Sequence, residues 1–223
     1  MPLKLEIACF SLPSAIIAEQ AGANRVELCD DISVGGVTPD HTIIKEAKEK
    51  LGIDLFIMVR PRGGDFVYSQ TEYKSMKADI EFCKKMKVNG VVFGILNTDN
   101  TVDLERNKEL VELAKPLSCS FHRAFDQVKN SPEALEQVIG CGFSRILTSG
   151  SLTSAENGTN NLSALVKQAK GRIIVMPGGG IRSENILKIK NETNATEFHS
   201  SAITDKTGLA DPGEVKLLIQ KLG

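Results

Sequence analysis

The chain has 223 residues and a mass of 24.2 kDa, and its 27 basic residues nearly balance its 28 acidic ones. A net charge of -1 and a sequence pI near 6.3 provide no general basic field, which argues against nucleic acid or a membrane as partner. The length suits one domain spanning 1–223, because α/β barrels commonly exceed 200 residues.

The cysteines are odd in number and contain no C-x-x-C pair. This pattern favours reduced thiols in a cytoplasmic protein over a disulfide framework or a structural zinc site. The N-terminus has no signal-peptide core, since Glu6 interrupts its apolar run, and no apolar stretch is long enough for a membrane span. The five cysteines are Cys9, Cys29, Cys83, Cys119 and Cys141.

Short β-rich segments alternate with helical patterns along the chain, which predicts βαβ units and a parallel sheet. Two of the helices are expected at 131–140, where Ser, Pro and Glu open the segment, and at 184–190 after Ser183. The expected strands are 3–9, 24–29, 54–60, 90–96, 117–123, 144–150, 172–178 and 195–201.

Eight such units in this length predict a (β/α)8 TIM barrel. An open doubly wound sheet has the same local pattern, but the glycine-rich dinucleotide motif that often follows its first strand is absent here. Cys9 is followed by FSLPS instead, so no nucleotide cofactor is expected.

Alternation along each strand separates helix-facing residues from barrel-interior residues. It predicts that Glu6 and Glu27 point inward, and it also places Arg25, Cys29, Met58, Arg60 and His122 inside. The last strand allows two faces, and we favour Glu197, His199 and Ser201 inward because Glu and His are poor helix-facing residues. The two interior carboxylates are either catalytic or part of a buried salt-bridge network that closes the barrel.

Charged residues follow the third and fifth strands, where barrel active sites lie. After the third strand, Arg60 and Arg62 flank a proline and precede Gly63, Gly64 and Asp65, which predicts a clamp for a carboxylate or phosphate. After the fifth, His122, Arg123 and Asp126 form a candidate proton-transfer group, or a His–Asp pair that fixes a loop.

Glycines and hydroxyls follow the last three strands, and such loops often bind phosphate in these barrels. The alternative for the triple glycine is a tight turn into the helix. The candidate anion-binding residues here are Ser149, Gly150, Gly178, Gly179, Gly180, Ser200 and Ser201.

Six strings in order give the chain a resemblance to the CutC family. They are Val26-Glu27-Leu28-Cys29, Arg60-Pro61-Arg62-Gly63-Gly64-Asp65, Phe121-His122-Arg123-Ala124-Phe125-Asp126, Leu147-Thr148-Ser149-Gly150, Met176-Pro177-Gly178-Gly179-Gly180 and His199-Ser200-Ser201-Ala202. The resemblance implies a cytoplasmic TIM barrel associated with copper homeostasis, with copper held by cysteines near the first strands.

Residue facing modifies that expectation, because Cu(I) prefers thiolate and thioether ligands. Cys29 is expected inside the barrel and Cys9 outside, while the family's first-strand cysteine often falls at the position of Ala8. The sequence therefore leaves Cys29 with His199, or with Met58, as the candidate Cu(I) ligands.

Three functions remain open at this point. The first is Cu(I) handling. The second is an isomerase, aldolase or lyase acting on a small phosphorylated or carboxylated metabolite, with Glu27 or His122 moving a proton. The third is a ligand-sensing or structural barrel, and a homo-oligomer is compatible with each of them.

Overall fold

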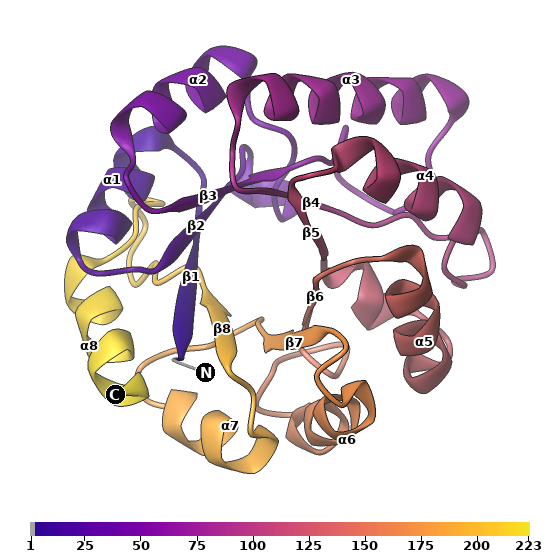
Figure 1. The fold of residues 1–223 in the computed structure, drawn as a ribbon. Helices are drawn as coiled ribbons and strands as arrows, with labels where there is room; N and C mark the ends of the chain where they lie inside the picture. Colours follow the sequence, from indigo (N-terminus) through magenta and orange to yellow (C-terminus); the bar gives the residue numbers. More distant parts are fainter. Residues whose placement is uncertain (1–2) are drawn as a thin grey trace.

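The computed structural model describes residues 3–223, and their strands form a parallel barrel with helices packed around the outside (Figure 1). The hydrogen-bonded order is β7-β6-β5-β4-β3-β2-β1-β8, so the barrel is nearly closed and its seam lies between β7 and β8. The expected TIM barrel is confirmed. The strands are β1 (Lys4–Cys9), β2 (Arg25–Leu28), β3 (Asp54–Met58), β4 (Gly90–Phe93), β5 (Ser118–Phe121), β6 (Arg145–Thr148), β7 (Ile174–Pro177) and β8 (Glu197–Ser200).

A helix follows each strand, and several helices begin at a side-chain cap. The longest, α3, is capped by Ser69, whose hydroxyl accepts from the Glu72 N–H while the Glu72 carboxylate accepts from the Ser69 N–H. The α-helices are α1 (Leu12–Gln20), α2 (His41–Lys50), α3 (Gln70–Met86), α4 (Leu104–Ala114), α5 (Ser131–Cys141), α6 (Thr159–Ala169), α7 (Ile186–Thr193) and α8 (Pro212–Leu222). Short 3₁₀ turns lie at Ile32–Val34 and Arg123–Gln127.

One helix start differs from its expected position. The 184–190 pattern predicted a helix capped by Ser183, but α7 begins at Ile186. Ser183 donates its hydroxyl to Glu214 of α8 instead, at 2.8 Å, and its N–H bonds the same carboxylate. A tertiary contact therefore takes the residue that the local pattern assigned to a cap.

The main apolar core lies between the strands and the helices, as the alternation predicted. Leu5, Ile7 and Cys9 of β1 all belong to it, and so does Phe198 of β8. Burying this aliphatic and aromatic layer between the strand ring and the helices supplies the main driving force for the fold. Within residues 3–223 no helix has the length and apolar character needed to cross a membrane.

The barrel interior below the strand ends contains several charged side chains beside a small apolar cluster of Cys29, Phe56, Met58 and Val92. Arg25 pairs with Glu6 and Glu197, and Arg145 lies 3.3 Å from the same Glu197. Both guanidinium groups stack on the Phe56 ring, at 4.9 and 4.8 Å from its centroid. These interior ion pairs form the floor on which the candidate site rests.

Candidate functional site

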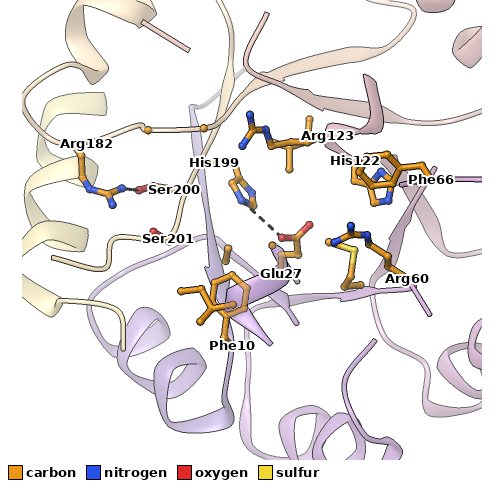
Figure 2. Close-up of a pocket in the computed structure, with 17 residues that line it drawn as sticks. Phe10, Glu27, Arg60, Phe66, His122, Arg123, Arg182, His199, Ser200 and Ser201 are labelled. Carbon is orange, nitrogen blue, oxygen red and sulfur yellow. Dashed lines mark hydrogen bonds and ion pairs between the residues drawn. The ribbon is translucent and has the colours of Figure 1, made fainter. Parts of the chain in front are cut away.

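A cavity of about 300 Å³ opens at the end of the barrel where the strands finish. Its position agrees with the usual active-site position in such barrels. Figure 2 shows Arg182 and Ser201 on one side, Arg60, His122 and Phe66 on the other, and Glu27 with His199 between them. The lining residues are Ala8, Phe10, Glu27, Ile32, Gly35, Met58, Arg60, Phe66, His122, Arg123, Leu147, Gly179, Gly180, Arg182, His199, Ser200 and Ser201.

The centre of this pocket is a chain of ionisable groups. Nε2 of His199 lies 3.8 Å from Oε2 of Glu27, and Nδ1 of the same ring lies 2.7 Å from Oε1 of Glu6. The other Glu6 oxygen accepts a hydrogen bond from Arg25. Because β1, β2 and β8 are adjacent in the barrel, they bring these four residues together across nearly the full length of the chain.

The two carboxylates have opposite pKa shifts. Burial, assisted by the charge of Glu6, raises the pKa of Glu27 to about 7 even though His199 opposes the shift. Burial acts in the same direction on Glu6, but Arg25 and His199 outweigh it and lower the pKa of Glu6 to about 2. Glu6 is therefore a fixed anion, while Glu27 can gain or lose a proton near neutral pH.

His199 is the partner of both carboxylates. Burial acts to lower its pKa, but the charges of Glu27 and Glu6 prevail and the pKa is raised. The two carboxylates therefore favour the protonated form of His199, in which Nδ1 donates to Glu6.

Arg60 forms part of one pocket wall and holds the loop between β2 and α2. Its Nη1 donates to the carbonyls of Val34 and Gly36, at 2.8 and 2.9 Å, and its Nη2 donates to the carbonyl of Gly64 at 2.9 Å. The guanidinium also lies over Phe66, 4.9 Å from the ring centroid. No carboxylate forms an ion pair with Arg60 among the described residues, and its positive charge, held by these three carbonyls, lies beside the cavity.

His122 lies on the same wall and is a neutral hydrogen-bond donor. Its Nδ1 accepts from the Ala124 N–H at 3.3 Å, so the ring proton is assigned to Nε2. Burial and the nearby charge of Arg60 lower the pKa of His122 to about 3. The imidazole therefore cannot serve as a base near neutral pH, although it can donate to an oxygen.

Three buried polar atoms of this site have no hydrogen-bond partner within residues 3–223: Glu27 Oε1, Arg60 Nε and His122 Nε2. Each side chain is at least nine-tenths buried and lines the pocket. An unsatisfied buried polar group costs roughly 1–3 kcal/mol, so three around one cavity indicate a site built for a polar ligand. The set offers one acceptor and two donors.

Arg182 stands on the opposite wall. Its Nη1 donates to the Ser200 hydroxyl at 3.2 Å and to the Ile181 carbonyl at 2.8 Å, and its Nη2 donates to the Ile203 carbonyl at 3.0 Å. These bonds fix the guanidinium on the same side of the pocket as Ser201 (Figure 2), and Gly180 is a further lining residue. No acidic side chain is paired with Arg182 among the residues described, so this wall also has a positive charge available to an anion.

The expected pair of arginines does not form one clamp. Arg62 donates Nε to Glu72 at 2.6 Å and Nη2 to Asp65 at 2.9 Å and to the Val67 carbonyl at 2.8 Å. The acidic first turn of α3 and the adjacent loop therefore hold the Arg62 guanidinium away from the pocket, where neither Arg62 nor Asp65 is a lining residue.

The expected proton-transfer group after β5 is also separated. Asp126 accepts from the hydroxyls of Thr148 and Ser149, from the Ser149 N–H and from Arg123. It has no bond to His122, so Asp126 joins the loops after β5 and β6, a loop-fixing role with partners other than the histidine.

The glycine-rich segments contribute only in part. Gly150, Gly178 and Ser149 do not line the pocket. The N–H groups of the two glycines donate to Thr148, and the Ser149 hydroxyl donates to Asp126 and to the Ser151 carbonyl. Gly179 and Gly180 do line it, with positive φ angles. The guanidinium of Arg123 lies so close to Gly179 that a Cβ there would be 3.1 Å from its Cζ.

Cys29 is the interior thiol that the alternation predicted. It packs with Phe56, Met58 and Val92, and its Sγ lies 3.5 Å from Oε2 of Glu27. Burial, together with the charge of Glu27, raises the pKa of the Cys29 thiol well above its ordinary value. Cys9 instead belongs to the outer core, so the described residues place a single thiol inside the barrel.

The pocket also contains residues that the sequence patterns did not identify. Arg182 lies five residues beyond the end of β7, outside the glycine segment that was expected to bind an anion. It follows directly after the triple glycine and Ile181. Phe10, Ile32 and Phe66 come from loops that fold over the strand ends, and no local pattern distinguishes such residues from other loop residues.

Comparison with known proteins agrees with the resemblance seen in the sequence. The family model described as "CutC family" matches residues 3–204. The chain is 51% identical over 199 residues to the "family protein CutC" of Parabacteroides distasonis, covering 89% of this chain and 82% of that protein. It is 46% identical to the human "Copper homeostasis protein cutC homolog" over 89% of this chain and 72% of that protein.

Solved structures give the same result. The crystal structure of CutC from Streptococcus agalactiae superimposes with a TM-score of 0.85 at 36% identity, covering 89% of this chain and 98% of that chain. Phosphoribosylanthranilate isomerase from Thermotoga maritima shares the barrel alone, with a TM-score of 0.64 at 14% identity over 99% of this chain and 98% of that chain. By its family match, its relatives and its structure, this chain belongs to the CutC family.

Proposed function

We propose that this protein takes part in copper homeostasis in the cytoplasm. The proposal rests on its membership of the CutC family and on the role named for the human relative, which is 46% identical. A cytoplasmic location is compatible with the five buried cysteines, all of which are free thiols.

Direct binding of Cu(I) would use Cys29. Its Sγ and Nε2 of His199 flank the same oxygen of Glu27, at 3.5 and 3.8 Å, and the thioether of Met58 belongs to the same interior cluster as Cys29. This set fits Cu(I) poorly, because it offers a single thiol, held in its protonated form, while Arg60 adds a positive charge nearby. In this proposal Cu(I) is the ion that the protein binds and hands on, and not a resident cofactor.

A competition titration against a chromophoric Cu(I) chelator tests direct binding. If Cys29 holds the ion, Cys29→Ser loses the stoichiometric site, whereas Cys83→Ser, which changes a thiol on α3, retains it. Equal binding by the parent and Cys29→Ser excludes this role for Cys29.

A second candidate function, binding of a small anionic metabolite at the strand ends, is favoured by the three unpartnered atoms of Glu27, Arg60 and His122. Arg60 and Arg182 supply positive charge on opposite walls, and about 300 Å³ accommodates a small metabolite. A positively charged pocket attracts phosphate or carboxylate and disfavours a bare cation.

A thermal-shift screen with sugar phosphates and small carboxylates tests this second function. We expect at least one of them to raise the Tm of the parent protein, and Arg182→Gln to lose that shift. The matched control is Arg172→Gln, because Arg172 is a surface residue paired with Glu136. If no anion stabilises the parent, or if Arg182→Gln responds like Arg172→Gln, the pocket is not the anion site.

A further inference from the structure

The walls of the pocket differ in chemistry, and this difference limits the kind of ligand. Arg182 and Ser201 with the Gly180 backbone form a cationic wall, and His122 and Arg60 form a wall with free N–H donors. Glu27 lies between them with one free oxygen (Figure 2). A ligand that satisfies both walls and Glu27 has an anionic group for the Arg182 wall and a carbonyl oxygen for the His122 and Arg60 donors. Between these two groups it has a proton that Glu27 can accept.

The protonation states divide the roles of the two candidate bases. His122 donates through Nε2 and stays neutral, because Nδ1 accepts the Ala124 N–H. Glu27 has an acceptor oxygen without a hydrogen-bond partner and lines the same pocket, so its carboxylate, rather than His122, is placed to accept a proton from a ligand. Nδ1 of His199 lies 2.7 Å from Glu6, so the imidazole beside Glu27 has a fixed position.

Resting on the second candidate function above, we propose that Glu27 transfers a proton between adjacent carbons of a phosphorylated hydroxycarbonyl compound, with His122 and Arg60 donating to its carbonyl oxygen. Glu27 removes the proton from the carbon next to the carbonyl group. The C–H electron pair forms a C=C bond, and the carbonyl π pair becomes an oxyanion that the His122 Nε2–H and the Arg60 Nε–H stabilise.

The isomerisation needs no co-reactant. The C=C electron pair takes the proton held by Glu27 and forms the new C–H bond at the former carbonyl carbon. The neighbouring hydroxyl loses its proton to the medium, its O–H electron pair forms the new C=O bond, and the first oxyanion gains a proton from the medium. The product is the isomeric hydroxycarbonyl compound, so the step is an aldose–ketose type of isomerisation. The phosphate on the Arg182 wall anchors the substrate throughout.

Hydrogen exchange in D₂O tests the proton transfer. Ribulose 5-phosphate and dihydroxyacetone phosphate serve as probes, and NMR follows deuterium entering the carbon next to the carbonyl group. Binding of each probe is measured separately by calorimetry. We expect the parent to bind at least one probe and to exchange its C–H proton, and Glu27→Gln to bind with an exchange rate about 10²- to 10⁴-fold lower.

Two further variants keep the result interpretable. Glu27→Asp retains the carboxylate but withdraws it by one methylene, so binding persists while exchange falls, even if Glu27→Gln folds badly. The matched control is Glu46→Gln, because Glu46 is exposed on α2 and paired with Lys50, so it exchanges like the parent. His122→Gln is expected to slow exchange about 10²-fold with binding retained.

The outcomes separate the two proposals. A parent that binds a probe but exchanges no proton, or a Glu27→Gln variant that exchanges as fast as the parent, overturns the role of Glu27 and leaves anion binding intact. A parent that binds neither probe overturns the substrate class, and if the anion screen also fails it overturns the anion site as well.

Discussion

Nε2 of His199 lies 3.8 Å from Glu27, while Nδ1 of the same ring lies 2.7 Å from Glu6. One imidazole therefore joins a carboxylate that is fixed as an anion to a carboxylate that titrates near neutral pH. The pKa values of the two carboxylates differ because Arg25 forms an ion pair with Glu6 and none with Glu27.

Glu6→Gln is expected to destabilise the protein by roughly 3 kcal/mol. The substitution removes a buried negative charge from Arg25 and His199 and leaves both cations less compensated in the barrel interior. Urea denaturation followed by circular dichroism measures the change. Glu46 is exposed, so Glu46→Gln is expected to have the same free energy of unfolding as the parent. If Glu6→Gln also matched the parent, the interior charges would contribute little to stability.

Glu27 makes the stability of the protein depend on pH in a defined direction. Its folded-state pKa is raised from 4.5 to about 7, so its contribution is fully present below pH 4.5 and is lost as the pH rises towards 7. Relative to the parent, Glu27→Gln should therefore gain up to about 3 kcal/mol of stability between pH 4.5 and pH 7. Parallel stability curves for the two proteins would contradict the raised pKa.

Glu6 has the opposite dependence. Its pKa is lowered to about 2, so its contribution is present above pH 4.5 and is lost as the pH falls towards 2. The carboxyl carbons of both residues report this directly by NMR. We expect the Glu27 signal to titrate near pH 7 and the Glu6 signal to stay that of a carboxylate down to about pH 3, and a single shared midpoint would contradict the assignment.

Gly179→Ala is expected to weaken anion binding. A Cβ at this position would lie 3.1 Å from Cζ of Arg123 and 3.2 Å from Cβ of Ser149, so the guanidinium has to move. Gly171→Ala is the matched control, because Gly171 also has a positive φ but has no atom within 4 Å of the added carbon. Calorimetry should show about tenfold weaker binding for Gly179→Ala alone, and equal affinities would mean that the added carbon leaves the anion site undisturbed.

Much of the fold could be predicted from the sequence, because strand alternation and helix periodicity are local properties. The facing of Glu197 and His199 followed from their polarity, and the interior position of Cys29 followed from alternation. The expected strands of six or seven residues shorten to the four to six residues that pair with neighbours, because pairing depends on the adjacent strand.

The parts that could not be predicted depend on distant partners. Arg60 and Arg62 are equivalent in the sequence pattern, but Glu72 of α3 holds Arg62 outside while Arg60 turns inward to the Val34 and Gly36 carbonyls. Arg182 enters the pocket because the Ile203 carbonyl and the Ser200 hydroxyl fix it. The sequence also could not separate Glu6 from Glu27. In the structure both oxygens of Glu6 have partners, whereas Glu27 has an oxygen without a partner.

A crystal structure of the protein with bound ribulose 5-phosphate tests the central claim, an anionic ligand held at the strand ends, most directly. We expect the phosphate to lie beside Arg182, Ser201 and Gly180, the carbonyl oxygen to lie within hydrogen-bond distance of His122 Nε2, and the adjacent carbon to face Glu27 Oε1. A phosphate bound elsewhere, for example against Asp126 and Ser151 in the neighbouring cavity, with the strand-end pocket free of ligand, would contradict it.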